Sequence, residues 1–101
     1  MSFIKMPSYH ILYGVDQGKE VRELLELDTL DLSVGIVHVL VSQSTLSLTP
    51  SFFLGCFKES IKTLGETQFR EKYKFYIESE FHSDFADSGI LLCVEELEKE
   101  R

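Results

Sequence analysis

The sequence predicts an α/β domain in which helices pack on a small, mostly parallel or mixed β-sheet. Segments rich in aromatic and β-branched residues alternate along the chain with segments of helical periodicity, and this order favours parallel strands joined by helical crossovers. The length of 101 residues suits one domain with one core, so we take 1–101 as a single domain. Hydrophobic residues make up 44% and charged residues 27%, which is typical of a globular protein.

The N-terminal third predicts one strand and one helix. Tyr9–Gly14 is rich in aromatic and branched residues and ends in glycine, as a first strand would. Asp16 is a plausible N-cap for an amphipathic helix over Lys19–Leu27, in which apolar and charged residues recur at helical spacing. Asp28–Asp31 is expected to be a connector.

Val34–Val41 (VGIVHVLV) is the clearest strand of the sequence. Apolar residues occupy both the odd and the even positions of this segment, so we expect a central strand that is covered on both faces. His38 interrupts this run. We favour a hydrogen-bonded core or strand-end histidine over a functional one, because buried polar groups are normally paired.

A polar loop, Ser42–Ser47, leads into the strongest helix signal. Thr49 is suited to the N-cap and Pro50 to the first helical position, where the missing N–H is not needed. The segment Ser51–Leu64 carries an apolar stripe at helical spacing, and Gly65 is a natural residue to end the helix.

The C-terminal third is less distinct. Phe69–Lys72 is expected to form a helical turn or a loop, and Tyr73–Glu78 alternates as a third strand does. After a break at Ser88-Gly89, Ile90–Glu100 has the length and charge placement of a helix, while a strand over Ile90–Val94 is the competing interpretation.

The charge and the motifs limit the function classes. A net charge of −7 makes nucleic acid and membrane surfaces poor partners, because both are anionic. The opening residues lack the apolar core of a signal peptide, so we expect a cytoplasmic protein. Gly14, Gly18 and Gly35 do not have the spacing of a phosphate-binding loop. Because the sequence shows no metal-binding or nucleophile motif either, we expect no cofactor, no metal and no catalytic activity.

The two cysteines, Cys56 and Cys93, lie far apart in apolar segments. This setting is typical of buried, reduced and poorly reactive thiols. A small thiol enzyme or hydrolase around either residue is the least favoured alternative.

Hydroxyl residues gather just before and at the expected helix start, among them Ser47, Thr49 and Ser51. A phosphate on Ser51 or Thr49 would lie where backbone N–H groups and the helix dipole favour negative charge. It would also change the surface by nearly two charge units. On spacing alone, ordinary turn and capping chemistry is the favoured explanation of the same residues.

Together these segments resemble the STAS-like domain, a compact relative of the sulfate-transporter and anti-sigma-factor-antagonist fold. The resemblance is strongest over 34–77. There VGIVHVLV is similar to the family's apolar strand, LTPSFFLGCFKESIKTLG to its hydroxyl run and helix, and QFREKYKFYIES to its basic stretch and next strand. The acidic segment 81–101 has no clear counterpart.

The resemblance implies a non-catalytic regulatory module. Relatives of this fold are mostly non-catalytic switches. Its antagonist branch binds an ATP-dependent serine kinase of the histidine-kinase-like ATPase type, and phosphorylation at the loop-to-helix junction releases that partner. By this resemblance Ser51, with Thr49 and Ser47, is the recognition or phosphorylation site. Pro50 departs from the small residue usual in the family, and the acidic residue common at the end of the central strand is missing.

The partner surface is expected at the apolar residues Leu46, Leu48 and Phe52 beside that junction. A second hypothesis uses the same residues for self-association, as a structural module without a phosphorylation switch. The resemblance itself is compatible with a monomer or a weak homodimer.

Overall fold

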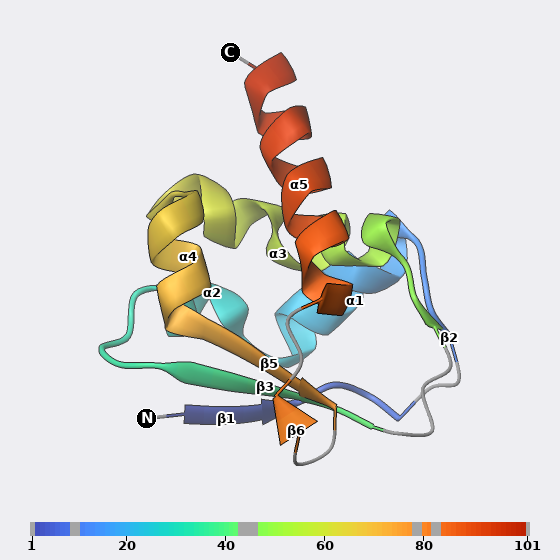
Figure 1. Ribbon diagram of the computed structural model, residues 1–101, viewed down its shortest axis with the longest axis vertical. Coiled ribbons are helices and arrows are strands. Elements are labelled where there is room, and N and C mark those ends of the chain that lie inside the picture. The colour runs from blue at the N-terminus through green and yellow to red at the C-terminus, as the bar shows by residue number, and fades with distance from the viewer. Residues whose placement is uncertain (1, 9–10, 43–46, 78–79, 82–83, 101) are drawn as a thin grey trace.

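The computed structural model describes residues 2–8, 11–42, 47–77, 80–81 and 84–100. The chain forms two layers, with the main sheet on one side and the helices on the other (Figure 1). The strands are β1 (Ser2–Lys5), β2 (Ile11–Leu12), β3 (Val37–Val41), β4 (Ser47–Leu48), β5 (Tyr73–Ile77) and β6 (Glu80–Phe81). The helices are α1 (Val15–Leu24), α2 (Leu27–Asp31), α3 (Pro50–Leu64), α4 (Glu66–Lys72) and α5 (Asp84–Lys99).

The main sheet has the order β1-β3-β5-β6. Its first three strands are parallel and β6 is antiparallel to β5. Each crossover, from β1 to β3 and from β3 to β5, steps in the same direction along the sheet. Crossovers of one hand that step in one direction place their helices on one face. The predicted α/β class with a mostly parallel sheet is therefore confirmed.

The first strand differs from its prediction. The sheet begins with β1 at Ser2–Lys5, which the sequence pattern did not single out. Within the predicted strand Tyr9–Gly14, only Ile11–Leu12 pairs, in a small separate ladder with β4, while Tyr9 and His10 lie outside the described residues. The pairing partner of a short strand is chosen by tertiary contact, which local pattern does not contain.

The first helix begins earlier than predicted. Gly14, at φ 87°, precedes α1 as its N-cap, so Asp16 lies in the first turn and is not the cap. The expected connector Asp28–Asp31 belongs to the short helix α2, which follows a reversal at Glu26 with φ 54°. This reversal explains why one continuous helix to Leu27 was wrong.

The central strand is shorter and less covered than predicted. β3 does lie between β1 and β5, and Val37, Val39 and Val41 are buried. His38, however, faces the side without helices and is half-buried, and Val34 precedes the strand at 97% exposure. Coverage on both faces was wrong because both crossovers place their helices on the same side.

The predictions for α3 are confirmed. Thr49 is its N-cap, Pro50 occupies the first turn, and Gly65 ends the helix at φ 82°. The C-terminal helix is also confirmed, and the strand alternative over Ile90–Val94 is wrong. Gly89 is no break but lies inside α5, where a Cβ atom would fall 2.3 Å from the Phe53 ring.

Aromatic side chains fill the space between the two layers. Phe53 and Phe57 of α3 meet Phe69 of α4 and Tyr73 and Phe75 of β5, with ring centroids 4.8–6.3 Å apart. All five residues are buried. Tilted and edge-to-face rings of this kind add to the gain from burial, so the start of α3 is held on a rigid base.

Two glycines set the distance between α1 and α3. A Cβ atom on Gly55 would lie 2.1 Å from the Val15 carbonyl oxygen, and one on Gly18 would lie 2.2 Å from the Phe52 carbonyl oxygen. Backbone atoms cannot yield as a flexible side chain does. The two helices therefore pack backbone to backbone where each begins.

The buried Arg22 joins this crossing to the sheet. Its Nη1 atom donates to the Cys56 carbonyl oxygen at 2.9 Å and to Ser60 Oγ at 2.8 Å. Its Nη2 atom donates to Asp31 Oδ2 at 2.7 Å, and the Tyr73 hydroxyl donates to Asp31 Oδ1 at 2.5 Å. Arg22 thus connects α1 directly with α2 and α3, and through Asp31 with β5.

We expect Gly55→Ala to destabilise the fold by about 1–3 kcal/mol or more, because the new methyl group overlaps backbone. At an exposed helix position the same change stabilises by roughly 0.5–1 kcal/mol, so the sign of the change in unfolding free energy distinguishes the two cases. Thr63→Ala, at an exposed position of the same helix, is the control and should change little. Urea unfolding midpoints measure both. A neutral Gly55→Ala would contradict the close crossing.

Candidate functional site

The starts of α1 and α3 lie together at one end of the domain. β2 leads into α1 and β4 into α3, and the two strands pair in parallel. The Thr49 N–H donates to the Leu12 carbonyl oxygen at 2.9 Å, which ties the two approaches together. In Figure 1 both helices begin at the same side of the molecule, above β2. We call Ile11, Tyr13, Thr49 and Ser51 the helix-start surface.

Thr49 and Ser51 form a compact hydroxyl pair on this surface. The Thr49 Oγ1 atom accepts a hydrogen bond from the Phe52 N–H at 3.2 Å, which makes it a working cap. Ser51 Oγ lies 3.1 Å from Thr49 Oγ1, and both residues are half-buried. Because Ser51 is the second residue of a 15-residue helix, a negative charge added to it would be stabilised by the helix dipole.

Two exposed apolar side chains belong to the segment whose backbone pairs with the approach to the hydroxyl pair. Ile11 is 52% exposed and Tyr13 is 64% exposed, whereas Leu12 between them is fully buried. The Tyr13 N–H donates to Gln17 Oε1 at 2.9 Å, which holds the entry to α1. The sequence prediction treated this segment as an ordinary strand and missed Ile11 and Tyr13. Their alternation with Leu12 was the available signal.

The predicted apolar partner surface is corrected at Phe52. Its side chain is 0% exposed and belongs to the core, so it offers no surface to a partner. Leu48 packs against the core as well and is half-buried. Leu46 lies outside the described residues. The backbone of Ser47 lies in β4, but its side chain is not among those that the structure describes.

The cysteines are buried as predicted. Cys56 and Cys93 are both free and 0% exposed. Burial raises the pKa of each thiol from 9.0 to about 12. A thiolate nucleophile would need a lowered pKa and access to a substrate, so this geometry favours a packing role.

His38 on the central strand β3 lies among aromatic side chains. His38 stacks on Phe3 with centroids 4.7 Å apart and shares a hydrogen bond of 2.8 Å between its Nδ1 atom and the Tyr76 hydroxyl. Its Nε2 atom is buried without a partner in the described part of the chain. Across those same residues, no three His, Cys, Asp or Glu side chains are close enough to hold a metal ion.

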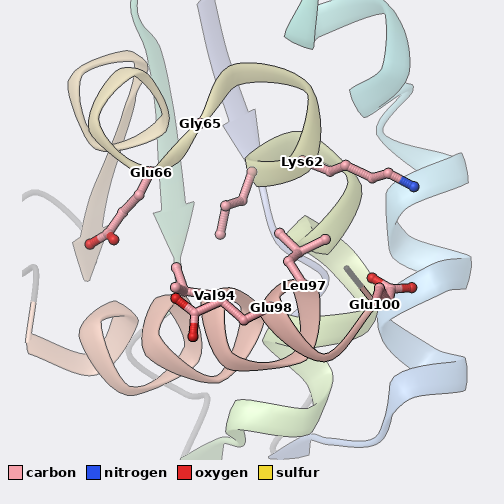
Figure 2. A pocket seen from close by; sticks show the side chains of 8 residues that line it. Lys62, Gly65, Glu66, Val94, Leu97, Glu98 and Glu100 are labelled. Carbon is pink, nitrogen blue, oxygen red and sulfur yellow. The ribbon is translucent and has the colours of Figure 1, made fainter.

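A groove of about 700 Å³ lies between the end of α3 and the second half of α5. Figure 2 shows Val94 and Leu97 on α5 opposite the end of α3, with Lys62 and Glu66 extending to opposite sides. Ile61 completes the apolar floor. The rim acids are partly neutralised, since Glu100 pairs with Lys58 at 3.2 Å and Glu66 with Arg70 at 3.0 Å. The groove offers apolar contact and carboxylates.

The chain matches no family model, no curated protein and no solved structure in comparisons with known proteins. The protein is therefore classified by its fold alone. It is a compact two-layer α/β domain whose main sheet has three parallel strands and one antiparallel strand. Among the helices that the structure describes, none combines the length and the apolar character needed to cross a membrane.

We expect Thr49→Ala to lower the free energy of unfolding by about 1 kcal/mol, because the Phe52 N–H loses its cap. Ser51→Ala should change stability by less than about 0.5 kcal/mol, as expected for a half-exposed hydroxyl that caps nothing. Urea unfolding of the two variants beside the wild type measures this difference. If both variants lost the same unfolding free energy, Ser51 would contribute to stability as much as Thr49, and Thr49 alone would not be the cap.

The thiol pKa values predict a pH dependence. The folded protein keeps thiol protons that the unfolded chain releases above pH 9, so this stabilising contribution is complete below pH 9 and is lost as the pH rises towards 12.

Reaction of the cysteines with a thiol reagent at pH 7.5–9 should be slow in the native protein, with a rate close to the rate of unfolding, and fast in urea. Rapid labelling of either cysteine in the folded protein would contradict this burial.

Proposed function

We propose that this chain is a non-catalytic protein–protein interaction module that binds its partner through the helix-start surface. The observation that carries the proposal is Ser51 in the first turn of α3, beside a working cap and two exposed apolar residues. An aromatic side chain next to polar groups is a common anchor in interfaces, which Tyr13 would supply.

The same surface is suited to control by charge. Phosphorylation of Ser51 adds nearly two negative charges and three acceptor oxygens. The start of α3 tolerates that charge, because no acidic residue lies in its first turn. A partner docked on Ile11 and Tyr13 would then face a new charge at its edge, which weakens binding and slows association.

The resemblance to STAS-like domains proposes the kind of partner. It would be a serine kinase of the histidine-kinase-like ATPase type, with Ser51 as the modified residue and Thr49 and Ser47 as its neighbours in the hydroxyl run. The rigid aromatic base under α3 supports this proposal, because a recognition surface on a rigid helix loses little entropy on binding.

We expect Ser51→Asp to weaken partner binding by about tenfold or more, and Ser51→Ala to leave it within about threefold. Thr67→Asp is the matched control, because Thr67 is exposed and occupies the same second position of α4. Immobilised wild type and the three variants are used to capture proteins from a cell extract. The purified candidate is then titrated against each variant to measure its affinity. Its Mg²⁺-ATP turnover is also measured, and mass spectrometry follows modification of Ser51.

A candidate retained by wild type, Ser51→Ala and Thr67→Asp but lost by Ser51→Asp supports the proposal. Equal affinity for all four proteins would remove the helix-start surface as the charge-controlled site. Equal loss with Thr67→Asp would show that added charge acts through the net charge of −7 and not locally.

A further inference from the structure

We propose that β1 pairs antiparallel with β1 of a second copy, so that two sheets join across a two-fold axis. β1 is the outer strand of the main sheet, and within the described residues no strand pairs with its other side. Figure 1 shows β1 at the margin of the sheet layer, away from the helices. An outer strand presents backbone donors and acceptors that a second strand can pair.

The hydrogen bonds of β1 show which groups are free to pair. The N–H groups of Ser2 and Met6 donate to the Ile36 and Leu40 carbonyl oxygens, each at 2.9 Å. A parallel ladder uses alternate residues of a strand, so Ser2, Ile4 and Met6 face β3. The N–H and C=O groups of Phe3 and Lys5 therefore point to the outer edge.

These four groups match one register of a second copy. With the two-fold axis beside Ile4, Phe3 of one copy lies opposite Lys5 of the other. In an antiparallel ladder such a pair exchanges both its hydrogen bonds, and the symmetry repeats the pair on the other side of the axis. All the outward groups of both strands are then satisfied without bending either strand.

The side chains in this register complement each other. Phe3 is 65% exposed and Lys5 is also exposed, and both lie on the face of the sheet without helices. The register places the ammonium group of each Lys5 near the ring of the other copy's Phe3, a favourable cation–aromatic contact. The ring is already oriented by its stacking on His38, at an interplanar angle of 21°.

The distribution of charge selects this edge for a second copy. Two chains of net charge −7 repel each other, so they approach best where acidic residues are fewest. β1, β3 and β5 contain no Asp or Glu, and their charged residues are Lys5 and Lys74. In the joined sheet the helices of both copies lie on the same face, and the two β1 strands that meet at the axis contain no acidic residue. The helix-start surface is formed by other elements, so this inference does not depend on the proposed function.

A single substitution tests the backbone pairing. Phe3→Pro removes the outward N–H and the ring but leaves the inward bonds of Ser2, Ile4 and Met6 to β3 intact, because proline is tolerated where the N–H faces outward. Phe3→Ala keeps the N–H and removes the ring. Sedimentation equilibrium from micromolar to millimolar protein should show a monomer–dimer equilibrium for wild type, a weaker one for Phe3→Ala, and a dissociation constant raised at least about tenfold for Phe3→Pro.

Cross-linking tests the register without relying on the proline variant. Ile4 of each copy should lie directly opposite its counterpart with Cα atoms about 4.5 Å apart, a distance that a disulfide spans. Oxidised Ile4→Cys should form a covalent dimer, whereas Phe3→Cys, displaced along the strand from its counterpart, should not. Wild type, with both cysteines buried, is the background control. A wild type that stays monomeric throughout, unchanged association of Phe3→Pro, or equal cross-linking of both cysteine variants would overturn the proposal.

Discussion

The backbone contact between α1 and α3 is the constraint on which the other features of this domain depend. Because Gly18 and Gly55 carry no side chain, the two helices approach until the carbonyl groups of Val15 and Phe52 take the space of a Cβ atom. This contact accompanies the pairing of β2 with β4, the two strands that lead into these helices. The helix-start surface exists because two chain segments that are distant in sequence begin their helices side by side.

Arg22 carries the constraint from the helices to the sheet. Burial by itself lowers the pKa of its guanidinium, but hydrogen bonds to Asp31 and Asp28 outweigh that effect, so the net pKa is raised. A buried ion pair of this kind adds little net stability against an apolar replacement, because desolvation offsets the attraction. Its consequence here is geometric: the guanidinium fits one arrangement of Asp31, Ser60 and the Cys56 carbonyl group, and Tyr73 completes that arrangement from β5.

The one-sided packing of the helices gives the domain two surfaces with different chemistry. The helical side carries the acidic residues of α1, α4 and α5, together with Ser51 and the groove of Figure 2. The sheet side carries Phe3, His38, Tyr76 and two lysines, and beside them lies the edge of β1 that no strand of the described residues pairs with. A module that self-associates through the sheet would leave its helix-start surface accessible to a different partner.

The amino-acid sequence by itself determined the class of fold, the capped helix α3 with Thr49, Pro50 and Gly65, the helical C-terminus and the burial of both cysteines. These features depend on local rules, namely capping, proline placement and apolar periodicity. Tertiary structure decided the rest. It chose Ser2–Lys5 over Tyr9–Gly14 for the sheet and buried Phe52. It also placed Gly89 inside α5, against the Phe53 ring, where a Cβ atom would not fit. Strand pairing, the covered face and backbone contact all depend on residues far apart in the chain, and no local pattern contains that information.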